Sequence, residues 1–76
     1  MKIIVNSMGG GKIELEVFET TSVLDIKNKL VPFTGLDIEQ QALLYNGKRL
    51  KEGETVEQLK IKEKSMISLV ISLRGG

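Results

Sequence analysis

Cysteine, histidine and tryptophan are absent from this sequence of 76 residues. Without thiols the chain forms no disulfide, which suits a reducing compartment. Without thiols or imidazoles it also lacks the side chains that most often bind zinc or act as nucleophiles and bases. The formal net charge of +1 argues against binding nucleic acid by neutralising phosphates. No apolar run approaches the ~20 residues that span a bilayer, and the first residues do not read as a signal peptide. We expect a protein that is not an enzyme, holds no metal or cofactor, and binds neither nucleic acid nor membranes.

The first third of the sequence has the pattern of a β-hairpin. Apolar and polar residues alternate over residues 2–7 and again over 12–18, and a turn rich in glycine separates the two segments. The composition, 41% hydrophobic and 28% charged, fits one small globular domain with a single core. The residues expected to face that core are Met1, Ile3, Val5, Ile13, Leu15 and Val17.

A helix is expected to follow, beginning after Ser22. The Ser22 hydroxyl can cap the first turn, and Asp25 suits the positive end of the helix dipole. Lys27 lies within the apolar stripe, so its ammonium group either pairs with a carboxylate or reaches water over a buried stem, and the pattern favours neither. Pro32 disfavours helical geometry at Val31, which predicts that the helix ends at about that residue. The apolar stripe consists of Val23, Ile26, Leu30 and Val31.

The second half of the sequence predicts a short hairpin and a short helical turn. Residues 40–45 form a candidate strand with Leu43 facing inward and Ala42 and Leu44 outward. Asn46-Gly47 is a strong signal for a two-residue turn, and residues 48–50 provide the return strand. The segment from Thr55 to Gln58 matches a capping box, so we expect a helical turn there. Val56, Leu59 and Ile61 are expected to hold this region to the core.

The end of the sequence has the pattern of a strand with one buried face. Ile67, Leu69, Ile71 and Leu73 alternate with Met66, Ser68, Val70 and Ser72. The simplest packing places this strand parallel to the first, with the helix crossing between the edges of the sheet. The fold class is then α+β, a helix grasped by a mixed sheet of about five strands. We expect a domain over residues 1–72 and a flexible tail over residues 73–76, because terminal glycines lose much entropy on ordering.

Short motifs at fixed spacing run through the chain from end to end. They are Leu15-Glu16-Val17, Lys27 with Lys29, Gly35, Gln40-Gln41 with Leu43, Gly47-Lys48 with Leu50, Gly53 with Thr55, Leu69-Val70 and Leu73-Arg74-Gly75-Gly76. Together these motifs resemble the ubiquitin and NEDD8 family. The resemblance implies a β-grasp fold and a protein modifier whose terminal carboxylate is activated with ATP and transferred through enzyme cysteines to lysines of target proteins.

The resemblance also implies which residues act at the end of the chain. Gly75 and Gly76 would carry the conjugated carboxylate, and Leu73, Arg74 and Ser72 would contact the activating enzyme. Ubiquitin has arginine at the position of Ser72 and NEDD8 has alanine. A NEDD8-type or dedicated activating enzyme therefore suits this chain better than the ubiquitin-type enzyme.

A partner-binding patch is implied on the domain itself. It maps onto Met8, Leu44, Ser68 and Val70, with Ser68 in place of a histidine; scattered surface apolar residues are the alternative interpretation. Ubiquitin has arginine on the rim of this patch at the positions of Ala42 and Ser72, so the rim is less basic in this chain. We therefore expect weaker binding to ubiquitin receptors that use acidic contacts.

Lys48, Lys29 and Lys27 are candidate acceptors for chains of the modifier, and the resemblance implies that Lys27 pairs with Glu52. The implied partners are activating, conjugating and ligating enzymes of the E1, E2 and E3 types, deconjugating proteases, ubiquitin-binding domains and target proteins. The resemblance further implies a monomer of the cytoplasm and nucleus. Two alternatives remain: a docking domain that is never conjugated, and a sulfur carrier with a thiocarboxylate at Gly76.

Overall fold

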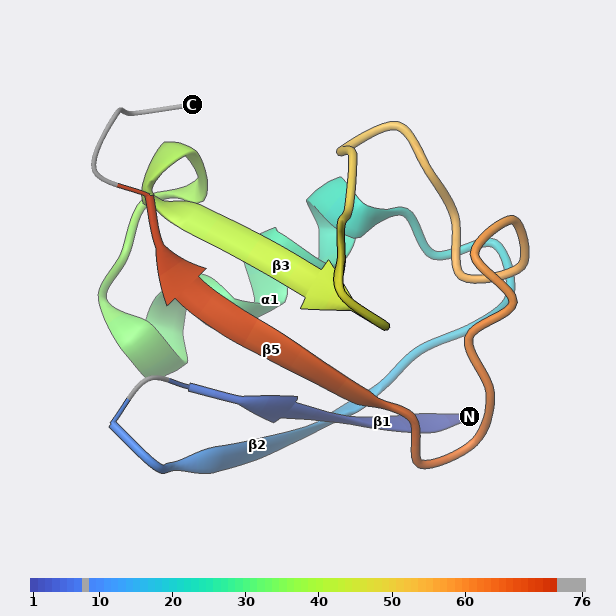
Figure 1. The fold of residues 1–76 in the computed structure, drawn as a ribbon, viewed down its shortest axis with the longest axis horizontal. Helices are drawn as coiled ribbons and strands as arrows, with labels where there is room; N and C mark the ends of the chain where they lie inside the picture. Colours follow the sequence, from blue (N-terminus) through green and yellow to red (C-terminus); the bar gives the residue numbers. More distant parts are fainter. Residues whose placement is uncertain (8, 73–76) are drawn as a thin grey trace.

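A mixed sheet of five strands curves around one helix in the computed structural model, which describes residues 1–7 and 9–72 (Figure 1). The elements are β1 (Lys2–Asn6), β2 (Lys12–Glu16), α1 (Val23–Thr34), the short 3-10 turn η1 (Ile38–Gln40), β3 (Gln41–Tyr45), β4 (Lys48–Arg49) and β5 (Met66–Ile71). The strand order is β2-β1-β5-β3-β4. This arrangement confirms the expected β-grasp fold.

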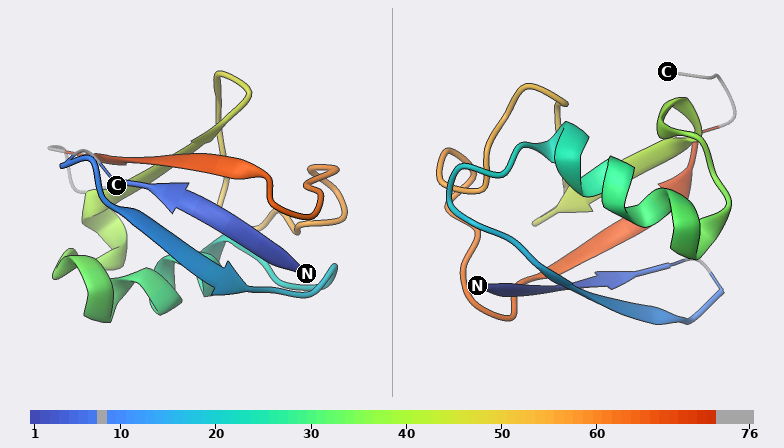
Figure 2. Two further views of the ribbon diagram at one scale, coloured as in Figure 1. Left: turned by 90° about the horizontal axis from the view of Figure 1, so that it is seen from below. Right: turned by 180° about the vertical axis from the view of Figure 1, so that it is seen from behind.

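β5 occupies the centre of the sheet. It pairs with β1 in parallel, with Val5 opposite Ile67, and with β3 in antiparallel fashion, with Leu43 opposite Leu69. Helix α1 covers one face of the sheet and leaves the other face open (Figure 2). The predicted parallel pairing of the first and last strands is confirmed.

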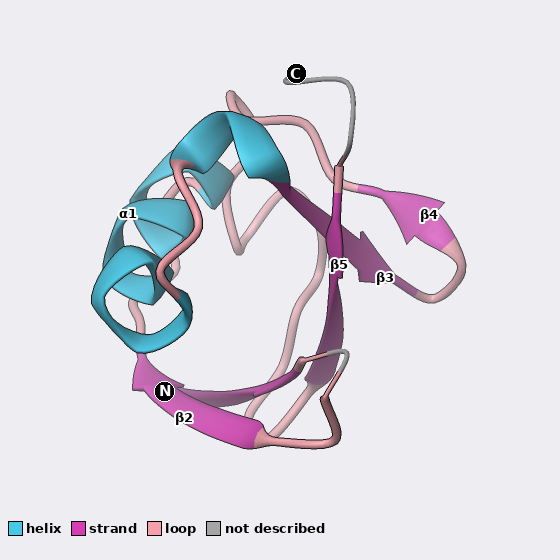
Figure 3. Ribbon diagram, turned by 90° about the vertical axis from the view of Figure 1, so that its left-hand side faces the viewer, coloured by secondary structure: helices cyan, strands magenta, loops and turns pink. Residues whose placement is uncertain are grey.

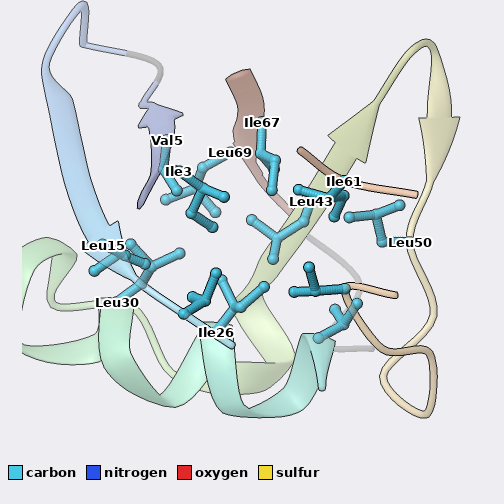
Figure 4. Packing of buried hydrophobic residues seen from close by; sticks show 13 residues of the cluster. Ile3, Val5, Leu15, Ile26, Leu30, Leu43, Leu50, Ile61, Ile67 and Leu69 are labelled. Carbon is cyan, nitrogen blue, oxygen red and sulfur yellow. The ribbon is translucent and has the colours of Figure 1, made fainter. Parts of the chain in front are cut away.

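The core fills the space between α1 and the concave face of the sheet (Figure 3). Strands β1 and β5 contribute every second residue, as period 2 requires. Helix α1 contributes Val23, Ile26 and Leu30 of the predicted stripe, whereas Val31 is only partly buried. Figure 4 shows these side chains meeting in one cluster. The buried members are Ile3, Val5, Leu15, Val17, Val23, Ile26, Leu30, Leu43, Leu50, Val56, Ile61, Ile67 and Leu69.

Helix α1 begins where the sequence predicts but ends later. The backbone N–H of Asp25 donates to the Ser22 hydroxyl over 3.1 Å, which confirms the N-cap. The predicted end at about Val31 is wrong, because the helix continues through Pro32 to Thr34. Pro32 has no backbone N–H, so only the carbonyl of Asn28, four residues earlier, loses its helical hydrogen bond. Asn28 is exposed, so water can donate to that carbonyl instead. No helix in the described part is both long and apolar enough to cross a bilayer.

Glycine ends the helix in the usual geometry. Gly35 has φ 72°, which favours glycine, and its N–H donates to the Val31 carbonyl over 2.8 Å. The Thr34 hydroxyl donates to the Leu30 carbonyl over 2.9 Å. These contacts hold the last turn together in spite of the proline.

The capping box at Thr55 forms, but no helix follows it along the chain. The N–H of Gln58 donates to Thr55 Oγ1 over 3.2 Å, and the N–H of Thr55 donates to Gln58 Oε1 over 3.1 Å. The predicted helical turn forms as a single turn over residues 56–60, in which the Leu59 N–H donates to the Thr55 carbonyl over 3.0 Å, and it does not continue into a helix. Lys60 reverses the chain at φ 58°, outside helical geometry, which ends the turn after one cycle. A further short helical turn, which the sequence did not predict, lies at η1.

One prediction for β3 also needs correction. Gln40 belongs to η1 and the strand starts at Gln41. Ala42 lies on the outer face as expected, opposite Val70 on β5, although it is only 5% exposed. Gln41 is buried and donates from Nε2 to the carbonyl of Lys27 over 3.0 Å, which ties β3 to the middle of the helix.

Candidate functional site

The root of the C-terminal tail is fixed to the sheet next to η1. The backbone N–H of Ser72 donates to the Gln40 carbonyl over 2.7 Å, one residue beyond the end of β5. Gln40 is itself held, because its Oε1 accepts from the N–H of Asp37 over 3.0 Å. Ser72, the last described residue, is therefore held at a defined point, at the end of the sheet where η1 meets β3 (Figure 1).

Five of the candidate residues lie outside the described part of the structure. They are Met8, Leu73, Arg74, Gly75 and Gly76. The division into a domain over 1–72 and a flexible tail over 73–76 stays a prediction for the same reason.

The described members of the expected patch lie together on the open face of the sheet. Leu44 on β3 is opposite Ser68 on β5, and Val70 lies two residues further along the same strand. Side chains of paired residues point to the same face, so the three share one surface. Leu44 and Val70 are partly buried and Ser68 is exposed. The geometry gives a shallow apolar surface with one hydroxyl at its centre.

The three candidate acceptor lysines differ in exposure. Lys48 is exposed in β4, with its Nζ 3.9 Å from Glu54 Oε2, and Lys29 is exposed on α1. The Lys27 side chain is 7% exposed, and its Nζ lies 3.2 Å from Glu52 Oε2. This ion pair confirms the expected partner. It also means that Lys27 would have to leave the core before its amine could react.

The amino group of Met1 is also held in place. It donates to Glu16 Oε2 over 2.7 Å and to the Val17 carbonyl over 3.0 Å, which fixes the start of β1 beside β2. Hydrogen bonding from this ammonium group, followed by its charge, lowers the pKa of Glu16 below its ordinary value of 4.5. Among the described residues, no group of three or more acidic side chains is placed to hold a metal ion.

An apolar groove that the sequence did not predict lies beside the ends of α1 and β5. Phe33 is 64% exposed at the end of α1, and Ile71 is 46% exposed at the end of β5. The groove has a volume of about 300 Å³. Its lining consists of Ser7, Gly9, Ile13, Phe33, Thr34, Leu36, Leu69 and Ile71.

Comparison with known families assigns this fold and these motifs to one group of proteins. The model of the "Ubiquitin family" matches residues 3–74, nearly the whole chain. The chain belongs to the ubiquitin family. As a member it shares the general character of a ubiquitin-like modifier.

Curated relatives of this ubiquitin-like chain include small proteins of nearly the same length. It is 33% identical over 76 residues to "Ubiquitin-like protein 1" of Schizosaccharomyces pombe, covering 100% of this chain and 97% of that protein. It is 30% identical over 76 residues to "Ubiquitin-like protein NEDD8" of Dictyostelium discoideum, covering 100% and 99%. A longer relative is the "Probable ubiquitin receptor RAD23" of Oryza sativa, with 38% identity over 79 residues, 100% of this chain and 20% of that protein.

Proposed function

We propose that this chain is a conjugated modifier: the Gly76 carboxylate is activated with ATP by an E1-type enzyme and then joined to lysines of target proteins. The observation that carries the proposal is the anchored residue before the last four. The Ser72 N–H donates to the Gln40 carbonyl just after β5, and the next four residues of the sequence are Leu73-Arg74-Gly75-Gly76. The relatives of nearly equal length named for NEDD8 and ubiquitin-like protein 1 support it.

The chemistry requires a narrow approach to a partner's active site. Gly75 and Gly76 have no Cβ, so they can enter a cleft that a larger residue would block. A free carboxylate does not acylate an amine in water, because its oxygen is a poor leaving group. ATP must therefore supply the activation, and the enzymes must supply the cysteine nucleophiles that this chain lacks.

Residues near the tail would select the activating enzyme. Leu73, Arg74 and Ser72 are the proposed contacts, and the small uncharged Ser72 favours a NEDD8-type or dedicated enzyme over a ubiquitin-type one. Lys48 and Lys29 are the exposed acceptors for chains, and Lys27 is a poor one because it is buried and paired. The proposed modifier is a monomer that acts in the cytoplasm and nucleus. Its proposed partners are E1, E2 and E3 enzymes, deconjugating proteases and ubiquitin-binding domains.

A docking domain that is never conjugated is the second candidate function. The specific observation that favours it is the surface formed by Leu44, Ser68 and Val70, together with the match to one fifth of a probable ubiquitin receptor. In this case Met8 would complete the patch, and partners would bind without any covalent bond.

A conjugation assay in a lysate of the source organism distinguishes the conjugated modifier from the docking domain. A chain tagged at its N-terminus is incubated with ATP and magnesium, purified under denaturing conditions and digested with trypsin. Modification predicts heavier species that resist reductant, and a Gly-Gly remnant on target lysines, because trypsin cleaves after Arg74. Gly76→Ala should abolish them. Partners retained only under native conditions, with no heavier species, would favour the docking domain.

A further inference from the structure

A turn of only two residues, Asn46 and Gly47, connects β3 to β4 at the edge of the sheet (Figure 3). Both residues have a left-handed backbone, with φ 54° at Asn46 and φ 76° at Gly47, as a two-residue turn of type I′ requires. Both are exposed. The side-chain amide of an asparagine and the backbone nitrogen of a glycine are therefore neighbours in contact with water.

This pair of residues can react without an enzyme. The Gly47 nitrogen loses its proton to base and attacks Cγ of Asn46, a new C–N bond forms, and the amide nitrogen leaves as ammonia. Water then opens the resulting succinimide ring. Opening at Cγ gives aspartate, whereas opening at the main-chain carbonyl gives isoaspartate, in which the backbone runs through the side chain. The overall balance is one water consumed and one ammonia released, with no oxidant or reductant.

We propose that Asn46 is a site of spontaneous deamidation in the folded chain, and that its isoaspartate product opens the β3–β4 hairpin. Gly47 leaves the attacking nitrogen uncrowded, because it has no side chain and even an added Cβ would meet nothing within 4 Å. None of the described carbonyls accepts the Gly47 N–H, so the attack breaks no backbone hydrogen bond of that group. The reaction does not depend on the function proposed above.

The two other asparagines of the chain lack these features. Asn6 lies in β1, and the N–H that follows it, on Ser7, is hydrogen-bonded to a carbonyl over 2.8 Å. Asn28 is exposed but lies inside α1, where the N–H of Lys29 belongs to the helical ladder. Exposure alone therefore does not distinguish the three asparagines, whereas the glycine and its free N–H do.

Ring closure requires a brief opening of the hairpin, because the succinimide forces the asparagine backbone out of the type I′ conformation. The opening costs little, since β4 has only two residues and pairs with β3 through Leu44 opposite Arg49 and Tyr45 opposite Lys48. Short segments with few contacts open at the low end of local stability. We therefore expect deamidation to be slower in the folded chain than in an unfolded one, but not prevented.

The two products affect the hairpin differently. Aspartate before glycine suits a type I′ turn as asparagine does. Isoaspartate adds one atom to the backbone, which a two-residue turn cannot hold in register. The pairing of β4 should then weaken, and with it the 2.8 Å bond from the Leu50 N–H to the Leu43 carbonyl. The change lies beside Lys48, whose Nζ is 3.9 Å from Glu54 Oε2, so this exposed lysine would lose its fixed position.

Peptide mapping by mass spectrometry tests the reaction. The folded chain, the chain unfolded in guanidinium chloride and a synthetic peptide of residues 41–51 are kept in mildly alkaline buffer. Asn46 should gain the mass of an oxygen in place of NH in all three samples, most slowly in the folded chain. Asn6 and Asn28 should stay intact in the folded chain. The peptide with Gly47→Ala should react more slowly, because a Cβ crowds the attacking nitrogen.

Amide hydrogen exchange tests the effect on the hairpin. An isoaspartyl methyltransferase with a labelled methyl donor measures the isoaspartate in the aged chain, and ion exchange isolates that fraction. Its Leu50 N–H should exchange about tenfold faster than in the fresh chain, the effect of losing one or two backbone hydrogen bonds. Asn46→Asp adds the same charge without the extra backbone atom and should leave this exchange unchanged.

Three outcomes would overturn the proposal. If Asn46 stays intact in the folded chain after the peptide has fully converted, the hairpin does not open enough to react. Equal conversion of Asn28 would show that the turn does not select the site. Equal Leu50 exchange in the isoaspartate fraction and in Asn46→Asp would show that the turn accommodates the extra atom. None of these measurements uses ATP or conjugating enzymes, so failure here is distinct from failure of conjugation.

Discussion

Lys27 and Glu52 form an ion pair of unequal burial. The two charged atoms are 3.2 Å apart, but the Lys27 side chain is 7% exposed and that of Glu52 is 49% exposed. The helix contributes the lysine and the loop after β4 contributes the carboxylate. The pair therefore joins two segments that are 25 residues apart in the sequence, and Glu52 is the only acidic partner of the buried ammonium within the described residues.

Glu52→Gln should destabilise the fold by about 1–2 kcal/mol, less than the loss of a fully buried pair because Glu52 is half exposed. The physical cause is an ammonium group left in the core without a counter-charge. Urea unfolding followed by circular dichroism measures the change. Glu57→Gln, an exposed carboxylate outside the ion pairs of the described residues, serves as the control. Equal stability of the two variants would show that Lys27 reaches water instead.

Pro32→Ala should stabilise the protein by about 1–2 kcal/mol, because alanine restores a helical N–H and relieves the ring's crowding at an exposed position near the helix end. Asn28→Ala changes helix propensity nearby without adding a donor and should gain only a few tenths of a kcal/mol. Chemical denaturation compares the two variants. If both variants gain the same free energy of unfolding, the missing N–H and the ring of Pro32 do not destabilise the helix.

The contact between the Met1 amino group and Glu16 predicts a pH dependence. The pKa of Glu16 is lowered in the folded state, so its contribution to stability is present above the unfolded value and disappears as the pH falls through the folded pKa. Carbon NMR of the Glu16 carboxyl should show a pKa below 4.5. Acetylation of the Met1 amine should return it towards that value. An unchanged pKa after acetylation would mean that another group causes the shift.

Hydrophobic periodicity was enough to predict most of this fold. The alternation in β1 and β5 and the stripe in α1 specify which faces are buried, and a parallel pairing of the first and last strands is the simplest way to bury both. The error at the end of α1 lies where one local signal outweighed another: Pro32 favoured an end at about Val31, but the helix continues to Thr34 and its cap is Gly35, whose N–H donates to the Val31 carbonyl. The capping box at Thr55 predicted a helical turn, and the chain makes one turn there before Lys60 reverses it at φ 58°.

The candidate site was less predictable than the fold. Alternation placed Leu44 on the outer face, and the family resemblance grouped it with Ser68 and Val70, but alternation cannot tell which strand lies beside which. The position of Leu44 opposite Ser68 therefore became visible only with the register of β3 and β5. The exposure of Phe33 and Ile71 was not predicted, because a pattern gives the direction of a side chain and not where the opposite layer ends.

Charging of Gly76 tests the central claim most directly. The purified chain is mixed with ATP, magnesium and, in separate reactions, ubiquitin-type and NEDD8-type activating enzymes, and the products are separated with and without reductant. A modifier predicts a thioester that reductant removes and that Gly76→Ala abolishes. The NEDD8-type enzyme should be charged faster, and Ser72→Arg should shift the preference towards the ubiquitin-type enzyme. If neither these enzymes nor the activating enzyme from the source organism forms a thioester, the chain is not a conjugated modifier.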